Sequence, residues 1–300
     1  IMQADTISGF MSGYETFSSK YFLNSLSMMA STPWVAITPM NQAADGMSNI
    51  IDANRIGSVS INTPTATSGS FISEDIQAVI LKGSTASTNG MYTNNGSFIY
   101  YDVAFASLPD RVNGSTLEYV DDASSWGYWL AREATTTTSN IAAGFWVAGV
   151  ETSVGVLESY RTGATVANYS GHVLGNLESG GIKDTIKLDA TNYINFNVSF
   201  GGANPVQLTG VGFTTVGGTS ITGSGITTSA SMISGVNPST TAVGANNFQG
   251  TASWNSGASN MQYFGKFFGP EANSMGGNWV GWFNSGAAKG IGVFKAGRTN

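Results

Sequence analysis

Alternation of apolar and polar residues with a period of two is the feature that most constrains the fold of this chain. A β-strand places successive side chains on opposite faces, so such alternation predicts a strand with one buried face and one face in water. The clearest example runs from Ile194 to Phe200, where asparagine and serine separate the apolar residues. Similar patterns predict strands over 169–175, 194–200, 206–215, 220–229, 247–254, 261–268, 278–283 and 290–296.

About eight antiparallel strands match a small up-and-down β-barrel whose own side chains fill the interior. Glycines such as Gly210, Gly212 and Gly250 interrupt these segments and leave room for large rings opposite them. We therefore predict an all-β protein in which a β-rich, handle-like region precedes an antiparallel barrel of about eight strands. The rings expected inside the barrel are Phe196, Phe200, Phe213, Phe248, Trp254, Phe267, Trp279, Phe283 and Phe294.

The composition indicates a folded protein with a largely uncharged surface. Charged residues make up 10% of the chain, against roughly 25% in an average soluble domain, and 39 glycines accompany abundant serine, threonine and asparagine. Aromatic residues reach 11%, which is enough for hydrophobic cores and argues against disorder. The formal net charge of −6 would repel phosphate backbones, so nucleic acid is not expected as a partner.

The 300 residues suffice for two domains of ordinary size, and we expect a boundary near Arg161. The first domain, 1–161, is the expected handle-like region, and the second, 162–300, is the expected barrel. From Phe10 to Phe22, aromatic residues recur at three- to four-residue spacing. This spacing favours one short helix within an otherwise irregular N-terminal segment.

Signals for targeting and for redox chemistry are missing from the sequence. Cysteine is absent, which excludes a disulfide, a zinc-thiolate site and a thiol nucleophile. There is no run of about eighteen apolar residues, so no transmembrane helix is expected. A signal peptide is not visible, and the start at Ile1 fits processing or truncation.

The sequence offers little material for catalysis. His172 is the only histidine and lies in an expected strand, without a serine nucleophile elbow. The glycine run from Gly217 to Gly225 lacks the lysine of a phosphate-binding loop and predicts a hairpin tip. Carboxylates such as Asp122 and Asp184 lack calcium-binding spacing and are interpreted as solvated turn residues. We therefore predict no enzymatic activity, no catalytic residue, no cofactor or metal, and no small-molecule substrate.

One stretch near the C-terminus predicts a fixed turn between two strands. Pro270 restricts φ, while Gly269 and the pair Gly276-Gly277 relieve steric conflict. We expect Ala272 to pack into the mouth of the barrel. The residues with this structural role are Phe268, Gly269, Pro270, Ala272, Gly276 and Gly277.

This stretch and the strand that follows it resemble the closing segment of the small β-barrel in transferrin-binding protein B lobes and related surface lipoproteins of Gram-negative bacteria. The shared elements are the Phe-Gly-Pro-Glu-Ala turn at 268–272, the glycine pair at 276–277 and the last strand with Gly-Val-Phe-Lys-Ala at 292–296. The resemblance implies a barrel and a location outside the cell or on the outer-membrane surface.

Two departures from that family stand out. Members of the family begin at an acylated cysteine, and this chain contains none. Two positions late in the turn are usually acidic in the family, and here they are Asn273 and Ser274. The resemblance therefore does not predict an ion pair between this turn and Arg298.

Tryptophan and tyrosine crowd the N-terminal half more densely than a small sheet usually needs for its core. Both residue types are enriched in protein interfaces, so a patch that faces a partner is one interpretation and core packing is the other. The residues predicted to face a protein partner are Trp34, Tyr100, Tyr101, Trp126, Tyr128, Trp129 and Trp146.

Three functions remain open from the sequence. The resemblance implies non-enzymatic binding at the cell surface or after secretion, with capture of a protein or an iron source. The neutral surface and the loosely patterned N-terminus also fit a subunit of an adhesive extracellular filament or surface layer that self-assembles by β-strand addition. A third function, haem capture, would use His172 as the iron ligand.

Overall fold

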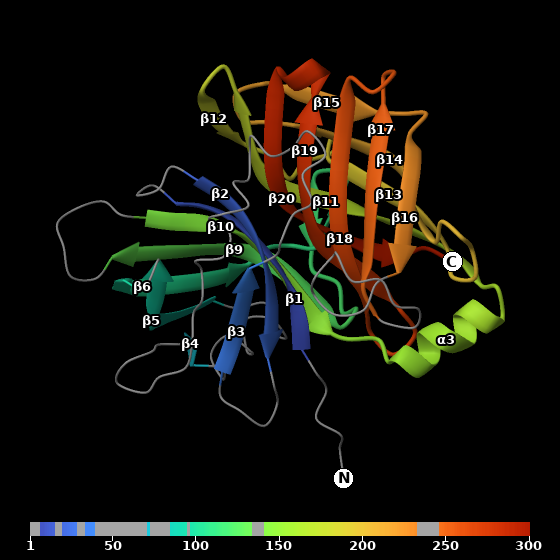
Figure 1. The fold of residues 1–300 in the computed structure, drawn as a ribbon, viewed down its shortest axis with the longest axis horizontal. Coiled ribbons are helices and arrows are strands. Elements are labelled where there is room, and N and C mark those ends of the chain that lie inside the picture. Colours follow the sequence, from blue (N-terminus) through green and yellow to red (C-terminus); the bar gives the residue numbers. More distant parts are fainter. Residues whose placement is uncertain are drawn as a thin grey trace, which may run out of the picture.

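The described part of the protein contains two large antiparallel β-sheets that pack against each other (Figure 1). In the described part of the chain they are accompanied by one helix, α3 (Val154–Thr162), and one short 3-10 turn, η1 (Asn284–Gly286). This architecture confirms the all-β prediction. No helix in the described part of the chain is long and apolar enough to cross a membrane. The computed structural model describes residues 7–15, 20–28, 34–39, 71–72, 85–94, 97–133, 141–232 and 246–300.

The first sheet contains eight strands in the order β4-β3-β2-β1-β10-β9-β6-β5. It curls, so that β4 and β5 at its two ends approach each other. Between β6 and β9 the chain forms a separate hairpin of β7 (Arg111–Asn113) and β8 (Thr116–Glu118). The strands of the sheet are β1 (Ile7–Glu15), β2 (Lys20–Met28), β3 (Trp34–Pro39), β4 (Phe71–Ile72), β5 (Thr85–Asn94), β6 (Ser97–Ser107), β9 (Ser124–Glu133) and β10 (Ile141–Val150).

The prediction of a short helix in an irregular N-terminal segment is wrong for residues 7–15 and 20–28, which are strands. β1 pairs with β2 on one side and with β10 on the other. Gly9 and Gly13 disfavour a helix, and the two ladders satisfy the backbone groups of β1. Since both edges of β1 are occupied within the chain, this strand is not free to join a neighbour's sheet.

The second sheet contains ten strands and follows the chain in an up-and-down order. β11 pairs with β13 and with β20, which joins the last strand to the first. The sheet has ten strands where eight were expected. One additional strand is β12, which forms a hairpin with β11. The other arises because the expected strand 220–229 is divided in two near Gly225, whose φ is +60°. The strands are β11 (Val166–Ser179), β12 (Ile182–Thr185), β13 (Tyr193–Ser199), β14 (Val206–Thr214), β15 (Ser220–Gly223), β16 (Thr227–Met232), β17 (Phe248–Trp254), β18 (Ser259–Phe268), β19 (Ser274–Phe283) and β20 (Ala288–Arg298).

A seam between β14 and β16 separates this sheet from a fully closed barrel. The described ladder begins at β15 and ends at β16, while β14 and β16 lie side by side without strand pairing. The Asn204 side chain bridges the seam, because it donates to the Thr228 carbonyl and accepts from the Ala230 N–H, both at 2.6 Å. An amide side chain thus replaces one rung of the ladder.

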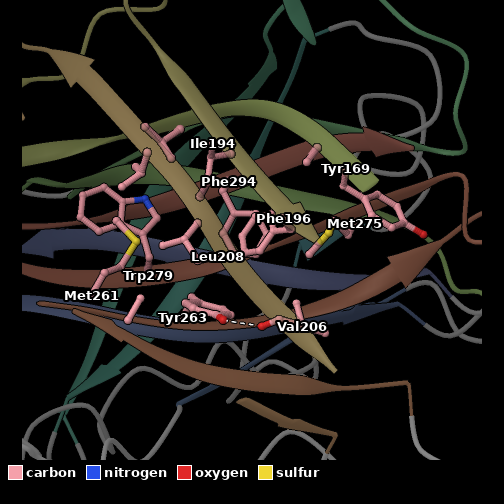
Figure 2. Packing of buried hydrophobic residues seen from close by; sticks show 14 of the residues in the cluster. Tyr169, Ile194, Phe196, Val206, Leu208, Met261, Tyr263, Met275, Trp279 and Phe294 are labelled. Carbon is pink, nitrogen blue, oxygen red and sulfur yellow. Dashed lines mark hydrogen bonds between the residues drawn. The ribbon is translucent and has the colours of Figure 1, made fainter. Parts of the chain in front are cut away.

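The aromatic prediction for the barrel interior is confirmed, since all nine predicted rings are buried in one cluster. Phe294 lies near its centre, with ring centroids 5.1 Å from Phe196 and 6.4 Å from both Phe248 and Tyr263. Figure 2 shows Phe294 and Phe196 together with the buried hydroxyl of Tyr263, which donates to the Val206 carbonyl at 2.6 Å. The described rings therefore form a packed core at this level of the barrel.

A second hydrophobic layer joins the two sheets. β1 and β10 pack on β19 and β20, where Phe10 and Val147 meet Phe264 and Val293 in one buried cluster. Gly276 permits this close approach, because a Cβ atom there would lie 2.6 Å from a methyl group of Val147. Part of the outer face of the barrel sheet is therefore buried against the first sheet.

The strands of the first sheet all come from residues 7–150 and those of the second from 166–298, with α3 between them. The shared hydrophobic layer nevertheless couples the two halves. Division into the domains 1–161 and 162–300 remains a prediction.

The contact at Gly276 gives a matched test of this packing. We expect Gly276→Ala to lower the free energy of unfolding by about 1–3 kcal/mol, because the added methyl group must push β10 away. Gly297→Ala on β20 is the control, since a Cβ atom there meets nothing within 4 Å. Urea unfolding of both variants measures the difference, and equal stabilities would contradict the described contact between the sheets.

Candidate functional site

The turn between β18 and β19 anchors the barrel to the connection between the sheets. Gly269, with φ of +86°, donates its N–H to the Val150 carbonyl at 2.9 Å, and its own carbonyl accepts from the Thr152 hydroxyl at 2.7 Å. Ala272 is fully buried in the barrel core, as expected, and its carbonyl accepts from the Tyr169 hydroxyl at 2.7 Å. The turn therefore holds the end of the first sheet against the barrel.

Arg298 also contacts this turn, although the acidic residues of the family pattern are absent. Its Nη1 atom donates to the Glu271 backbone carbonyl at 3.1 Å, and its backbone N–H donates to the Asn273 carbonyl at 2.9 Å. Backbone carbonyls thus replace the carboxylate of an ion pair.

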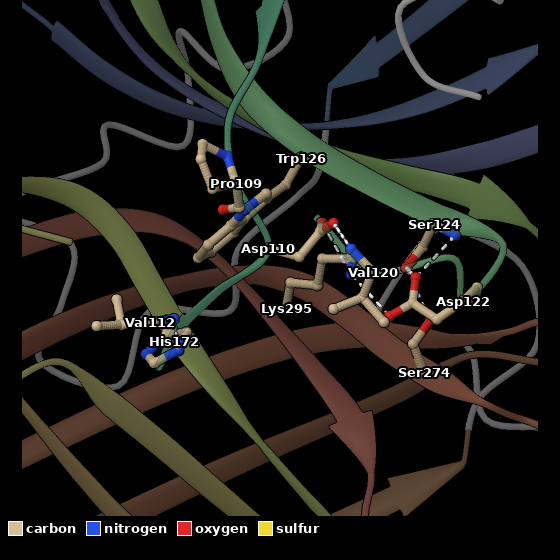
Figure 3. Close-up of polar contacts among 10 residues, drawn as sticks. All are labelled: Pro109, Asp110, Val112, Val120, Asp122, Ser124, Trp126, His172, Ser274 and Lys295. Carbon is tan, nitrogen blue, oxygen red and sulfur yellow. Dashed lines mark hydrogen bonds and ion pairs between the residues drawn. The ribbon is translucent and has the colours of Figure 1, made fainter. Parts of the chain in front are cut away.

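A buried lysine forms the centre of the polar contacts between the sheets (Figure 3). Lys295 on β20 has its Nζ atom 3.0 Å from an oxygen of Asp110 and 2.8 Å from an oxygen of Asp122. The three side chains are only 3%, 6% and 9% exposed. The interpretation of Asp122 as a solvated turn residue is therefore wrong, because its charge is buried against a lysine from the other sheet.

Backbone and hydroxyl groups fix both carboxylates in place. The Val120 N–H donates to Asp110 at 2.7 Å, and the Ser124 hydroxyl lies 2.9 Å from Asp122. Ser124 also contacts the Ser274 hydroxyl on β19 at 2.7 Å. Burial raises the pKa of the Asp110 carboxyl, while the charge of Lys295 opposes that rise. We call Asp110, Asp122 and Lys295 the lysine clamp.

A second lysine on the same face of the barrel sheet is also paired. Lys266 on β18 forms an ion pair with Glu151, which in turn accepts from the Ser8 hydroxyl on β1. The Lys266 side chain is 8% exposed. Each buried ammonium group on this face is therefore neutralised by a carboxylate from the N-terminal half.

His172 contacts the β7–β8 hairpin, which lies between the two carboxylates of the lysine clamp in the sequence. Its Nδ1 atom donates to the Asn192 carbonyl at 2.5 Å, since a carbonyl only accepts, and its Nε2 atom accepts the Val112 N–H at 3.0 Å. Burial lowers the pKa of His172, and the donor role of one ring nitrogen with the acceptor role of the other matches the neutral imidazole. A haem iron would need the Nε2 lone pair, which is already used, so the geometry does not support haem capture through His172. No group of three or more metal-ligating side chains occurs among the described residues.

The face of the first sheet that packs against the barrel is not covered along its whole length. Part of this face is accessible to solvent. Tyr128 and Leu130 on β9 are 45% and 41% exposed. Phe145 on β10 lies directly opposite Tyr128 in the strand register. Leu130 belongs to the next row of cross-strand neighbours, which continues across β10 to Tyr14 on β1 and then to Tyr21 on β2. We call these five residues the aromatic patch.

The hairpin β11–β12 borders the aromatic patch with two charged groups. The Nζ atom of Lys183 lies 3.4 Å from the ring centroid of Tyr14, which is a cation–π contact. The Tyr21 hydroxyl donates to Glu178 at 3.0 Å, and burial together with this hydrogen bond raises the pKa of Tyr21. The patch thus has an apolar centre and a polar rim.

The structure places the predicted partner-facing residues in different environments. Trp126 and Trp146 are fully buried and Trp129 is 5% exposed, so these three residues pack the fold and we do not retain them as partner contacts. Tyr128 is exposed and belongs to the aromatic patch. The side chains of Trp34, Tyr100 and Tyr101 lie outside the described part of the structure.

Four residues of the aromatic patch were not predicted from the sequence. Leu130 continues the period-two row of Trp126 and Tyr128, and this alternation was the signal that could have revealed it. Tyr14 and Tyr21 lie in the segment for which the aromatic spacing predicts a helix. Their common face became visible only with the register of β1, β2 and β10.

Comparisons with protein-family models and with curated proteins give no match. Similar solved structures include a double mutant of transferrin-binding protein B from Haemophilus parasuis, with 15% identity over 80% of this chain and 40% of that chain and a TM-score of 0.40. Intact Ap-TbpB, with N and C lobes, shares 11% identity over 99% of this chain and 77% of that chain, with a TM-score of 0.40. The haemoglobin receptor HpuA from Kingella denitrificans shares 12% identity over 88% of this chain and 94% of that chain, with a TM-score of 0.31. The chain spans less than half of the Haemophilus parasuis proteins that it matches.

Removal of the lysine from the clamp tests its role. We expect Lys295→Met to cost about 3–5 kcal/mol at pH 7, because two carboxylates remain buried without a cation. The triple variant with Asp110→Asn and Asp122→Asn should recover most of this loss. Urea unfolding at neutral pH compares the three proteins, and a loss below 1 kcal/mol for Lys295→Met would contradict a buried clamp.

The pH dependence of the same variant has a defined sign. A carboxyl with a raised pKa holds its proton more tightly in the folded state, so its contribution to stability falls as the pH rises through that pKa. Without Lys295 the pKa of Asp110 should rise further. The loss caused by Lys295→Met should therefore be smaller near pH 4.5 than at pH 7, and a larger loss in acid would contradict the burial of these carboxylates.

Proposed function

We propose that this chain is a non-enzymatic binding protein that captures a protein partner through the aromatic patch. The partly exposed Tyr128 and Leu130 carry the proposal. Tyrosine is enriched among the few residues that supply most of the binding energy in protein interfaces, where surrounding contacts exclude water. Lys183 and Glu178 provide charged groups at this rim.

The scaffold beneath the aromatic patch favours binding without a large ordering cost. Its side chains stand on β1, β2, β9 and β10, which are paired strands rather than loops. Strands in a ladder lose little backbone freedom on association, so more of the contact energy remains as affinity. Asp122 of the lysine clamp lies two residues before β9 and ties the start of that strand to the barrel.

We further propose that the protein acts at the surface of a Gram-negative bacterium or after secretion. The resemblance of segment 264–298 to transferrin-binding protein B lobes supports this location. It also suggests soluble iron-carrying proteins of a host as the first partners to test. Under this proposal a second contact region contains the exposed Ile182, at the start of β12, and the exposed Val216, whose N–H donates to the Thr185 carbonyl at the end of β12.

A binding experiment with a paired variant tests the proposal. We expect wild-type protein to bind one of transferrin, haemoglobin or lactoferrin saturably in biolayer interferometry. The double variant Tyr128→Ser/Leu130→Ser should lose at least about tenfold in affinity without a change in melting temperature. Val166→Ser is the control, because Val166 is 51% exposed and lies at the far end of β11 from the hairpin that borders the patch.

Two outcomes would contradict the proposal. Binding that is equal in wild type and the double variant would move the interface elsewhere on the molecule. Failure of all three carriers to bind would reject the proposed partner class.

A further inference from the structure

A groove on the outer face of the barrel is lined by neutral polar side chains. It has a volume of about 290 Å³ and crosses β16, β17 and β18, which lie side by side in Figure 1. Strand register places the outward side chains in two rows of three. The first row is Thr227, Ser253 and Asn260, and the second is Ser229, Thr251 and Gln262.

The floor of the groove belongs to the core of the barrel. Ala252 and Met261 line the groove but point inward, and they are 2% and 1% exposed. The outward rows therefore stand on packed strands, which hold their side chains at fixed spacing. Such positioning favours recognition of a ligand with a repeated pattern of polar groups.

Most of these outward polar side chains have no partner within the described protein. Asn260 donates its amide to the Gly257 carbonyl at 2.9 Å, whereas Gln262, Thr251 and the other three hydroxyl groups form no hydrogen bond with described residues. Hydroxyls and amides both donate and accept. The groove thus offers several neutral donors and acceptors at once.

The chemistry of the groove selects against other ligand classes. No charged residue lines it, so it has no means to neutralise a phosphate, a sulfate or an acidic sugar. It also lacks the exposed aromatic and aliphatic residues that anchor protein partners. A neutral polyhydroxyl ligand matches the lining without burial of an uncompensated charge.

One aromatic ring lies next to the first row. Trp282 on β19 pairs in register with Asn260 and is only partly buried. A sugar ring has an apolar C–H face that packs on aromatic rings, while its hydroxyl groups remain free for hydrogen bonds. Trp282 lies outside the lining of the groove and packs partly against the hydrophobic layer between the sheets, so only its accessible part borders the first row.

We propose that this groove binds a neutral oligosaccharide. The site is separate from the aromatic patch, so neither the success nor the failure of protein capture decides it. Gln262 and Thr251 supply central hydrogen bonds to sugar hydroxyls, and the accessible part of Trp282 supports one sugar ring.

A glycan array with neutral and acidic oligosaccharides, followed by isothermal titration calorimetry with the best neutral probe, tests the proposal. We expect neutral glycans to bind in preference to sialylated or sulfated ones. Gln262→Ala and Thr251→Ala should each weaken binding by about 2- to 10-fold, the loss of one hydrogen bond, and the double variant should lose more. Thr222→Ala on β15 is the matched control, because Thr222 is exposed outside the groove.

Circular dichroism melts establish that each variant remains folded, as expected for substitutions on an exposed face. No binding of any neutral glycan at millimolar concentration would overturn the proposal. A preference for acidic glycans would overturn it as well, and so would full affinity in the double variant.

Discussion

The burial of two lysine side chains between the sheets is the constraint on which the arrangement of this protein depends. Lys295 and Lys266 stand on the outer face of the barrel sheet, where an unpaired ammonium group would be costly to desolvate. Asp110, Asp122 and Glu151 from the N-terminal half neutralise them. Hydrophobic burial around Phe10 and Val147 supplies attraction without direction, whereas these charges fit only one orientation of the sheets.

This orientation determines which surfaces remain accessible. The part of the first sheet near Trp126 is covered by the barrel, while Tyr128 and Leu130 on the same strand emerge beyond its edge. On the barrel, β16, β17 and β18 present an uncharged polar groove. The two surfaces differ in chemistry, one apolar with a charged rim and the other neutral and polar, so they suit different ligands.

Much of the barrel could be predicted from the sequence, because strand alternation and ring size are local signals. The nine rings assigned to the interior are all buried, and Ala272 packs into the barrel as expected. The break near Gly225 was missed, because a positive φ cannot be recognised from alternation alone. The strands β1 and β2 were missed, because aromatic spacing over a short segment suits both a helix and a strand.

The site was harder to predict, because its contacts join residues that are distant in the sequence. Asp122 resembles any solvated turn residue until Lys295 is placed beside it. Trp126 and Tyr128 are equivalent in pattern, and only the edge of the barrel sheet makes one buried and the other exposed. Exposure on a sheet face is thus a tertiary property that residue type does not determine.

Native-state hydrogen exchange tests the central claim most directly. If the buried lysine pairs join the sheets into one cooperative body, backbone amides of β10 and β20 should exchange with the same free energy of opening, equal to that of global unfolding. That free energy should fall together for both strands in Lys295→Met. Exchange of β10 through an opening that leaves β20 protected would contradict the account, because the sheets would then separate without unfolding.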